Sequence, residues 1–174
     1  MSRSPKTWRT AESRCEIAVN DWIDEIAKLW EIADGRGGTV TSFRVYEKNE
    51  FPESLPAGVI CAITYTLDVE SAYSLGGPLV DRWRGITEFH FPWGVDKSHF
   101  PEIMLFFARI RNAAAGSMTL GSRVAHFLLR TQNTGGQSIQ GPVTLTYGSE
   151  APHHGLLVYW EVKDDESGQF TPAA

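Results

Sequence analysis

The sequence predicts an α+β fold: a mixed, mainly antiparallel sheet of about four to five strands with two helices packed on one face. Two segments have helical periodicity, and the strand-like runs between and after them are joined by short turn sequences. Strands joined by short turns pair in antiparallel fashion, and amphipathic helices then cover one face of the sheet. The predicted order is helix, strand, strand, helix and three further strands.

The first predicted helix spans residues 11–33. Its apolar side chains recur at steps of three and four residues, which builds one helix face: Val19, Ile23, Ile26, Trp30 and Ala33. The sequence GRGG at 35–38 ends this helix, because glycine adopts the left-handed conformation of a C-cap at little cost.

The segment after the first helix contains Pro52 and Pro56 and is predicted to be a loop. The apolar run 58–67 predicts a strand that is buried on both faces or lies in an interface. Residues 68–81 are interpreted as a long loop or extended excursion. The sequence RWRGITEFHF at 82–91 alternates in polarity and therefore predicts the next strand.

The second helix is predicted to begin after Ser98, a suitable N-cap, and to end at Gly116. Its apolar stripe consists of Phe100, Ile103, Phe107, Ile110 and Ala114. Alternating residues within 123–131, 143–147 and 156–162 predict three more strands. We expect a single domain over 11–166, flanked by flexible segments at 1–10 and 167–174.

Composition restricts the classes of function. The 174 residues are 42% hydrophobic and 21% charged, as in ordinary globular domains, and the net charge of -5 disfavours direct nucleic-acid binding. No apolar run reaches the roughly 18 residues that span a bilayer, and the basic N-terminus lacks the apolar segment of a signal peptide. Cys15 and Cys61 are expected to be free thiols, with a disulfide as the alternative.

The adjacent His153 and His154, in YGSEAPHHGLLVYWEV, raise the question of a metal or acid–base site. Neighbouring residues of a strand point to opposite faces, which makes them a poor ligand pair. Pro152 and Gly155 flank them as turn residues do, so the favoured interpretation is the tip of a β-hairpin. The other histidines lack metal-ligand spacing, and we predict neither a metal nor a cofactor.

Other catalytic patterns are weak. Glu88 and His90 are two residues apart on one strand face, where an acid–base pair is possible but a solvated face is the commoner reason for the pattern. The sequence contains no GxSxG motif, and its glycine-rich segments do not continue as phosphate-binding loops. We predict no catalytic residue and expect that the protein is not an enzyme.

Several apolar residues fall outside the predicted elements, which is typical of a partner surface. Trp93 lies in the turn PWG, and Tyr73 and Leu75 lie in the 68–81 segment. The last strand ends in concentrated negative charge, formed by Asp164, Asp165 and Glu166.

The order and local texture of these segments resemble a known family. A helix (IAVNDWIDEIAKLW) precedes a proline-containing loop that enters a strand (ESLPAGVICAITY), and a second strand (WRGITEFHF) leads to a helix (FPEIMLFFARIRNA). A closing hairpin reads GPVTLTYGSEAPHHGLLVYWEV. Across residues 11–166 the chain resembles the tail-terminator and tail-completion proteins of long-tailed bacteriophages and related head–tail connector subunits.

The resemblance implies a structural virion protein that assembles in the host cytoplasm. Its subunits would form a homo-oligomeric ring, typically a hexamer, that ends the tail tube and joins it to the connector or neck proteins of the head. DNA would pass through the ring without sequence-specific binding, and no membrane would be involved. Asp164, Asp165 and Glu166 would line the channel and repel phosphates, while His153 and His154 would contact the next ring.

Two alternatives remain at the level of the sequence. The first is a small metal-dependent or acid–base enzyme that uses Glu88, His90 or the pair His153 and His154. The second is a cytosolic α+β ligand-binding module, whose loops would line an internal cavity.

Overall fold

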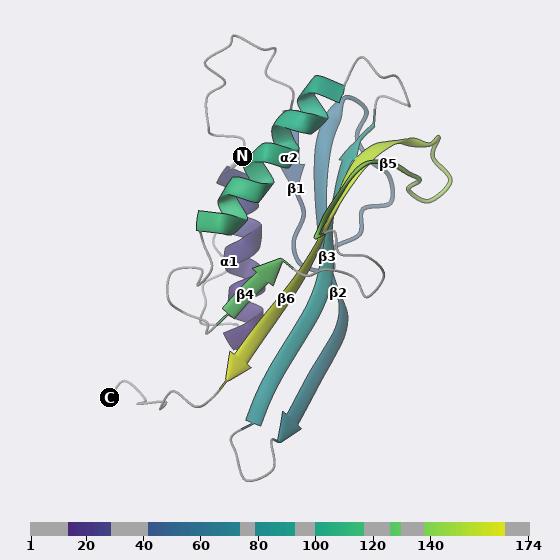
Figure 1. Cartoon of the computed structure of the whole chain (residues 1–174). Coiled ribbons are helices and arrows are strands. Elements are labelled where there is room, and N and C mark those ends of the chain that lie inside the picture. The colour runs from purple at the N-terminus through teal and green to yellow at the C-terminus, as the bar shows by residue number, and fades with distance from the viewer. Residues whose placement is uncertain are drawn as a thin grey trace.

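The computed structural model describes residues 14–28, 42–73, 79–92, 100–116, 126–129 and 138–165. Within these residues the α+β class is confirmed (Figure 1). The elements follow in the order α1 (Arg14–Lys28), β1 (Ser42–Val45), β2 (Val59–Tyr73), β3 (Leu79–Phe91), α2 (Phe100–Gly116), β4 (His126–Leu129), β5 (Ile139–Leu145) and β6 (His153–Asp165).

The strands form one mixed, mainly antiparallel sheet, as the sequence predicts. Their order is β1-β2-β3-β6-β4, and β5 also pairs with β6. Only the pairing of β1 with β2 is parallel among the described strands. Because β3 occupies one edge of β6 along its length, the short strands β4 and β5 share the other edge, β5 near the start of β6 and β4 near its end.

Both helices pack on the same face of the sheet. Alternate residues of β3 point to one face, and Thr87, Phe89 and Phe91 are three of them. Trp22 of α1 donates a hydrogen bond from Nε1 to Thr87 Oγ1 (3.1 Å). Phe106 of α2 packs against Phe89 and Phe91, with ring centroids 6.3 and 5.7 Å away. One face of β3 therefore holds both helices.

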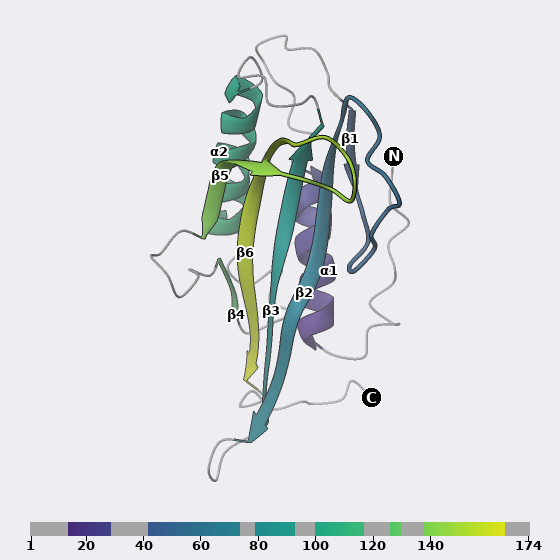
Figure 2. The ribbon, with the colours of Figure 1, turned by 90° about the vertical axis from the view of Figure 1, so that its right-hand side faces the viewer.

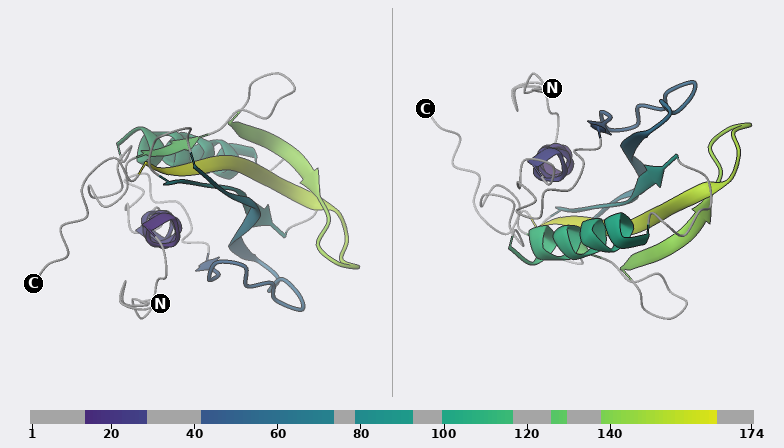
Figure 3. Two further views of the ribbon diagram at one scale, coloured as in Figure 1. Left: turned by 90° about the horizontal axis from the view of Figure 1, so that it is seen from below. Right: turned by 90° about the horizontal axis from the view of Figure 1, so that it is seen from above.

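The sheet is strongly twisted when it is viewed along its strands (Figure 3). This twist lets the two helices cover different parts of one face: α1 contacts β1, β3 and β6, and α2 contacts β5 and β6 as well as the rings of β3. Neither described helix is both long and apolar enough to cross a membrane.

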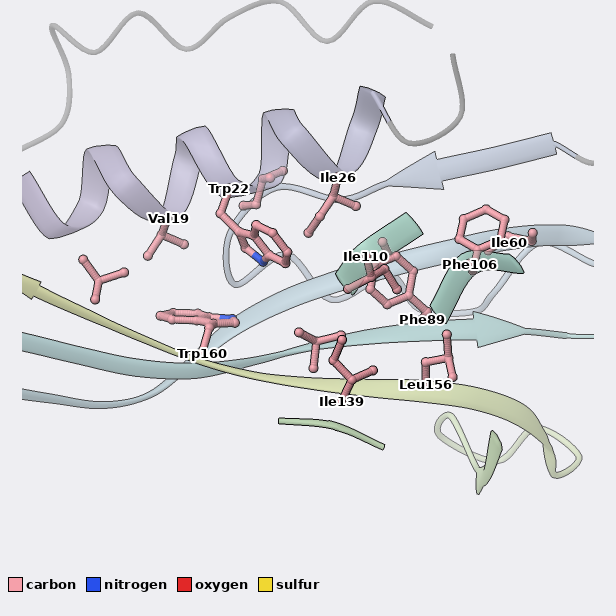
Figure 4. Close-up of a cluster of buried hydrophobic side chains, with 14 of the residues drawn as sticks. Val19, Trp22, Ile26, Ile60, Phe89, Phe106, Ile110, Ile139, Leu156 and Trp160 are labelled. Carbon is pink, nitrogen blue, oxygen red and sulfur yellow. The ribbon is translucent and has the colours of Figure 1, made fainter. Parts of the chain in front are cut away.

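The main core lies between the helices and the sheet, where side chains from both layers interdigitate (Figure 4). The predicted apolar face of α1 is buried as expected over the described part of the helix: Cys15, Ala18, Val19, Trp22, Ile23 and Ile26. Each large side chain that is fully buried contributes roughly 1.5–3 kcal/mol of transfer free energy. Trp30 and Ala33 lie outside the described residues.

The first half of β2 is buried on both faces, as its apolar run predicts. Ile60 and Ala62 belong to the core under the helices. On the opposite face, which we call the outer face of the sheet, Cys61 and Ile63 are covered by a second, smaller cluster that includes Tyr46 and Leu55. Both cysteines are buried free thiols, in agreement with the predicted absence of a disulfide.

Two sequence interpretations are wrong. Residues 42–45 belong to the segment that was predicted to be a loop, but they form β1 beside β2. Residues 68–73 and 79–81 are not a loop but the continuation of β2 and β3, paired from Asp68↔Arg84 to Tyr73↔Leu79. A register shift between Thr66 and Asp68 interrupts the alternation of β2 at this point. The interruption, together with acidic residues that are rare in strands, explains why the pattern resembles a loop.

Gly85 is the position at which the sheet accepts the indole of Trp160 from the neighbouring strand. A Cβ built on Gly85 would lie 2.1 Å from Trp160 Cζ2 and 2.3 Å from the backbone oxygen of Tyr65. Since Trp160 is 1% exposed, its ring has no open space into which it can move. The absent side chain of Gly85 is therefore part of the core packing.

We predict that Gly85→Ala destabilises the protein by about 3 kcal/mol, because overpacking forces the buried indole and a backbone carbonyl to shift. The matched control is Gly148→Ala in the β5–β6 turn, where φ is 56° and no atom lies within 4 Å of the added Cβ. Its loss is about 1–2 kcal/mol, from left-handed backbone strain alone. Urea unfolding of both variants checks the ranking, and equal losses would contradict it.

Candidate functional site

A buried hydrogen-bonded network crosses three strands on the outer face of the sheet. Tyr65 Oη donates to Glu88 Oε1 (2.8 Å), and Glu88 Oε2 lies 3.0 Å from His90 Nε2. His90 Nδ1 lies 2.8 Å from His153 Nε2. We call Tyr65, Glu88, His90 and His153 the histidine network. It links β2, β3 and β6 in a single row of polar groups.

The strand register brings these residues together. Glu88 and His90 are two residues apart in β3 and therefore share a face, as the sequence predicts. Gly155 of β6 lies directly opposite His90. A Cβ at Gly155 would come within 2.2 Å of Leu145 Cδ1 and 2.6 Å of Phe89 O. Glycine at this position leaves His153, two residues earlier in β6, as the adjacent side chain on the outer face.

The histidine network is closed to solvent at one end and open at the other. His90 is 1% exposed and His153 is 2% exposed. The side chain of Glu88 is 22% exposed, and Tyr65 is half-buried beside it. A proton can therefore enter or leave the row at Glu88, whereas the two imidazoles are sealed from water.

The number of N–H groups limits how many of these hydrogen bonds the two imidazoles can make at once. Glu88 accepts from His90, one proton lies between the two rings, and Ala151 O accepts from His153 Nδ1 at 3.2 Å. These links need three N–H groups, but two neutral imidazoles supply only two. Two neutral imidazoles therefore leave one of the three links without a proton.

The pKa shifts follow from this geometry. Burial raises the pKa of Glu88, but the hydrogen bonds from His90 and Tyr65 outweigh burial, so the pKa lies below its ordinary value of 4.5. Burial lowers the pKa of His153 below 6.5, and the charge of His90 lowers it further. Burial therefore opposes the protonation of His153 in the folded protein.

A cysteine adjoins the histidine network without joining it. Cys61 of β2 pairs across the strands with His90, but its thiol donates to the backbone oxygen of Val59 (3.4 Å). Burial raises the pKa of the Cys61 thiol to about 11. The thiol is protonated at neutral pH and is not an activated nucleophile.

Two loops close over the buried end of the histidine network. Tyr147, in the β5–β6 turn, donates a hydrogen bond to Pro52 O in the loop between β1 and β2. In the same turn Glu150 Oε1 accepts from Leu55 N at 2.7 Å. The Tyr147 ring meets His90 edge-on, with centroids 5.6 Å apart. We call this pair of loops the clasp; Figure 2 shows the turn arching across the outer face of β3 and β2.

Farther along the outer face, ion pairs alternate in sign across the same three strands. Arg84 contacts Asp68 (3.2 Å) and Glu161 (3.0 Å). Arg82 contacts Glu161 and Glu70, each at 3.6 Å. The pairs to Asp68 and Glu70, whose side chains are each 52% exposed, contribute roughly 0–1 kcal/mol each. The two arginines are therefore matched by carboxylates and do not form a basic patch for nucleic acid.

The histidine pair does not lie at the tip of the hairpin, so that prediction is wrong. The turn occupies residues 146–152, and β6 begins at His153. His153 faces the histidine network, whereas His154 faces α2, where its ring packs edge-on against Phe100 with centroids 5.0 Å apart. The opposite orientation of the two rings agrees with the strand rule. His153 is buried and His154 is half-buried, and their predicted contact with the next ring stays a prediction.

The acidic end of β6 includes one buried residue, and the predicted channel-lining role stays a prediction. Asp164 is 4% exposed, and its Oδ1 lies 3.3 Å from Arg14 Nη1 of α1, so within one subunit it pairs with the first helix. The backbone of Asp165 pairs with Val80. Glu166 lies outside the described residues. The sequence could not identify the basic partner of Asp164, because the two residues are 150 positions apart.

The remaining predicted partner contacts are not tested. Trp93 and Leu75 lie outside the described residues, and for Tyr73 the structure gives only the backbone, which ends β2 opposite Leu79. The exposed large apolar side chains that the structure does describe are different ones: Phe51, Leu67, Val69, Met104 and Leu105. Val69 belongs to the 68–81 segment that the sequence singles out, whereas Leu67 ends the predicted strand 58–67. Met104 and Leu105 were missed, because they lie inside a strongly apolar helix.

The described residues include no group of three or more His, Cys, Asp or Glu side chains that could hold a metal ion. A surface pocket of about 470 Å³ lies apart from the histidine network, and its lining comes from α2, β4 and β5: Phe107, Arg111, Leu129, Ser138, Ile139 and Gly141. No family model and no curated protein sequence matches the chain.

We predict that the stability of the protein falls in acid in two steps. The pKa of His153 is lowered by folding, so its contribution is complete above 6.5 and is lost as the pH falls through the folded value. The pKa of Glu88 is also lowered, which adds a second loss below about 4.5. Urea unfolding between pH 8 and pH 3 measures both steps.

The variants His153→Gln and Glu88→Gln assign the two steps. His153→Gln keeps a donor toward His90 but does not titrate, so the loss that begins below pH 6.5 should become shallower. Glu88→Gln should instead reduce the loss below pH 4.5. A wild-type stability that is constant from pH 7 to pH 5 would contradict the assignment to His153.

Proposed function

We propose that the protein is a structural subunit of a homo-oligomeric ring at the head–tail junction of a long-tailed bacteriophage. The ring ends the tail tube and joins it to the connector or neck proteins, and DNA passes through it. The order of helices and strands that underlies the resemblance to tail-terminator proteins supports this proposal. The histidine network, the clasp and the ion pairs then serve to hold each subunit in a fixed shape.

The observation that carries the proposal is the exposed apolar surface of the β2–β3 hairpin. Leu67 and Val69 of β2 are each 55% exposed. Beyond β1, which pairs only with residues 59–62, no described strand covers this edge of β2. In Figure 1 the ends of β2 and β3 reach past the ends of α1 and β6. An uncovered sheet edge with exposed apolar side chains favours contact with a partner subunit.

Acid–base catalysis is the second candidate, and the histidine network is the observation that favours it. A carboxylate, two imidazoles and a tyrosine in one row resemble the proton-handling groups of hydrolytic sites. However, both rings are sealed under the clasp, and only Glu88 and Tyr65 lie within reach of a substrate. The network is therefore better suited to joining three strands and two loops than to attacking a ligand.

The test of the ring is its direct observation. Negative-stain electron microscopy of the purified protein over a range of concentrations, with and without magnesium, should reveal particles with a central hole. Solution mass from sedimentation should rise with concentration to one fixed multiple of the subunit mass. A protein that stays monomeric under all of these conditions, including in the presence of isolated tail tubes, would contradict the proposal.

A further inference from the structure

The contact between His90 and His153 supports the clasp from below. The two facing ring nitrogens lie 2.8 Å apart, and both side chains are buried. His153 Nδ1 also lies 3.2 Å from the oxygen of Ala151, which belongs to the β5–β6 turn. The Tyr147 ring of the same turn packs edge-on against His90. The position of this turn, and with it the clasp, therefore depends on the two imidazoles.

The clasp is a packing unit separate from the main core. It covers the smaller cluster on the outer face, whose buried members are Tyr46, Leu55, Cys61 and Ile63. Hydrogen bonds from Tyr147 to Pro52 O and from Leu55 N to Glu150 join its two loops. The main core lies on the other face of the sheet and includes none of these residues. The clasp can therefore open at a lower free-energy cost than the unfolding of the whole protein.

The contact between the rings requires that one of the two facing nitrogens carries no proton. An imidazole nitrogen accepts a hydrogen bond only when it is unprotonated, and an imidazolium carries a proton on both nitrogens. When His90 and His153 are both protonated, two N–H donors face each other where one donor and one acceptor are needed. Their positive charges then also repel each other in a site from which water is excluded. The fully protonated pair is therefore incompatible with the closed clasp.

The other charged and titratable groups around the pair do not remove this conflict. They come from every neighbouring element: Arg44 of β1, Tyr46 of the β1–β2 loop, Cys61 and Tyr65 of β2, Glu88 of β3, Tyr147 and Glu150 of the β5–β6 turn, and Tyr159 of β6. Burial opposes a proton on His153, and so does the charge of His90. Ala151 O and the carboxylates Glu150 and Glu88 favour the proton but do not prevail, so the pKa of His153 lies below its ordinary value of 6.5. The closed clasp therefore refuses a proton that water-exposed imidazoles accept.

We propose that the clasp opens in mild acid while the main core stays folded, because the fully protonated histidine pair forces the two rings apart. At neutral pH the rings share a proton, and the clasp stays closed over the outer face (Figure 2). Opening gives both imidazoles access to water and uncovers Cys61 and Ile63 beside them. Acid thus converts a closed face into an apolar surface with two positive charges. The inference does not depend on the proposed ring, since it concerns contacts within one subunit.

Hydrogen exchange of backbone amides, followed by NMR between pH 7 and pH 5, tests the proposal. The Leu55 amide reports the clasp, because its N–H is bonded to Glu150 across the two loops. After correction for the intrinsic exchange rate at each pH, the opening constant at Leu55 should rise about tenfold per pH unit below pH 6.5, the slope for one proton taken up on opening. The amides of β3, which is paired on both sides, should keep their protection over the same range.

Two variants with the same substitution assign the effect to one histidine. His153→Gln cannot become a cation, and its amide oxygen can accept a hydrogen bond from a protonated His90, so the opening constant at Leu55 should no longer depend on pH in this range. The matched control is His154→Gln, which removes the adjacent imidazole on the helix-covered face, where it packs against Phe100. This control should keep the slope of the wild type.

Tyr147→Phe tests the clasp without changing either histidine. It removes the hydroxyl that donates to Pro52 O and leaves the ring against His90. The opening constant at Leu55 should rise roughly fivefold at every pH, as for the loss of one hydrogen bond, and the slope with pH should be unchanged. An unchanged opening constant would show that the two loops do not close as one unit, which contradicts the proposal.

The remaining outcomes separate a local opening from other effects of acid. An opening constant at Leu55 that is the same at pH 7 and pH 5 in the wild type would overturn the proposal. A slope that persists in His153→Gln would also overturn it, because a carboxylate such as Glu150 would then control the opening. Loss of protection in β3 together with Leu55 would mean that acid unfolds the whole protein, and this result too is incompatible with the proposal.

Discussion

The alternation of β3 is the constraint on which the rest of the structure depends. This strand is paired on both sides, to β2 and to β6, and each of its residues is committed to one face. The residues facing the helices, such as Thr87 and Phe89, receive Trp22 and Phe106. The residues between them supply the arginines of the ion pairs and then Glu88 and His90 to the outer face. A shift of one residue in this register would exchange the two sets.

The faces of β3 could be read from the sequence, because a period of two is a local property. The pairing of Glu88 with His90 followed from the same rule. The position of His153 could not be obtained in this way. It depends on where the β5–β6 turn ends and on the absence of a side chain at Gly155, where Leu145 and Phe89 O from other strands leave no room for a Cβ. The flanking Pro152 and Gly155 indicated a turn, but only the proline lies in it.

The fold class could be predicted from the sequence, whereas the bounds of several strands could not. Two amphipathic helices and a set of apolar runs leave few ways to bury their apolar faces, which is a global argument that tolerates local errors. The hairpin ends of β2 and β3 escaped prediction because Asp68 and Glu70 are unusual in strands. Each carboxylate pairs with an arginine of the neighbouring strand, and this pairing depends on the register of β2 and β3, which the local pattern does not show.

The two buried thiols lie in the two separate packing layers. Cys15 belongs to α1 and the helix-side core, and Cys61 faces the cluster under the clasp. Burial raises the pKa of both, to about 12 and about 11, so neither reacts with an alkylating reagent while its layer is closed. Alkylation of Cys15 would therefore report detachment of α1, and alkylation of Cys61 would report opening of the clasp. The two alkylation rates would rank the free energies of these local openings.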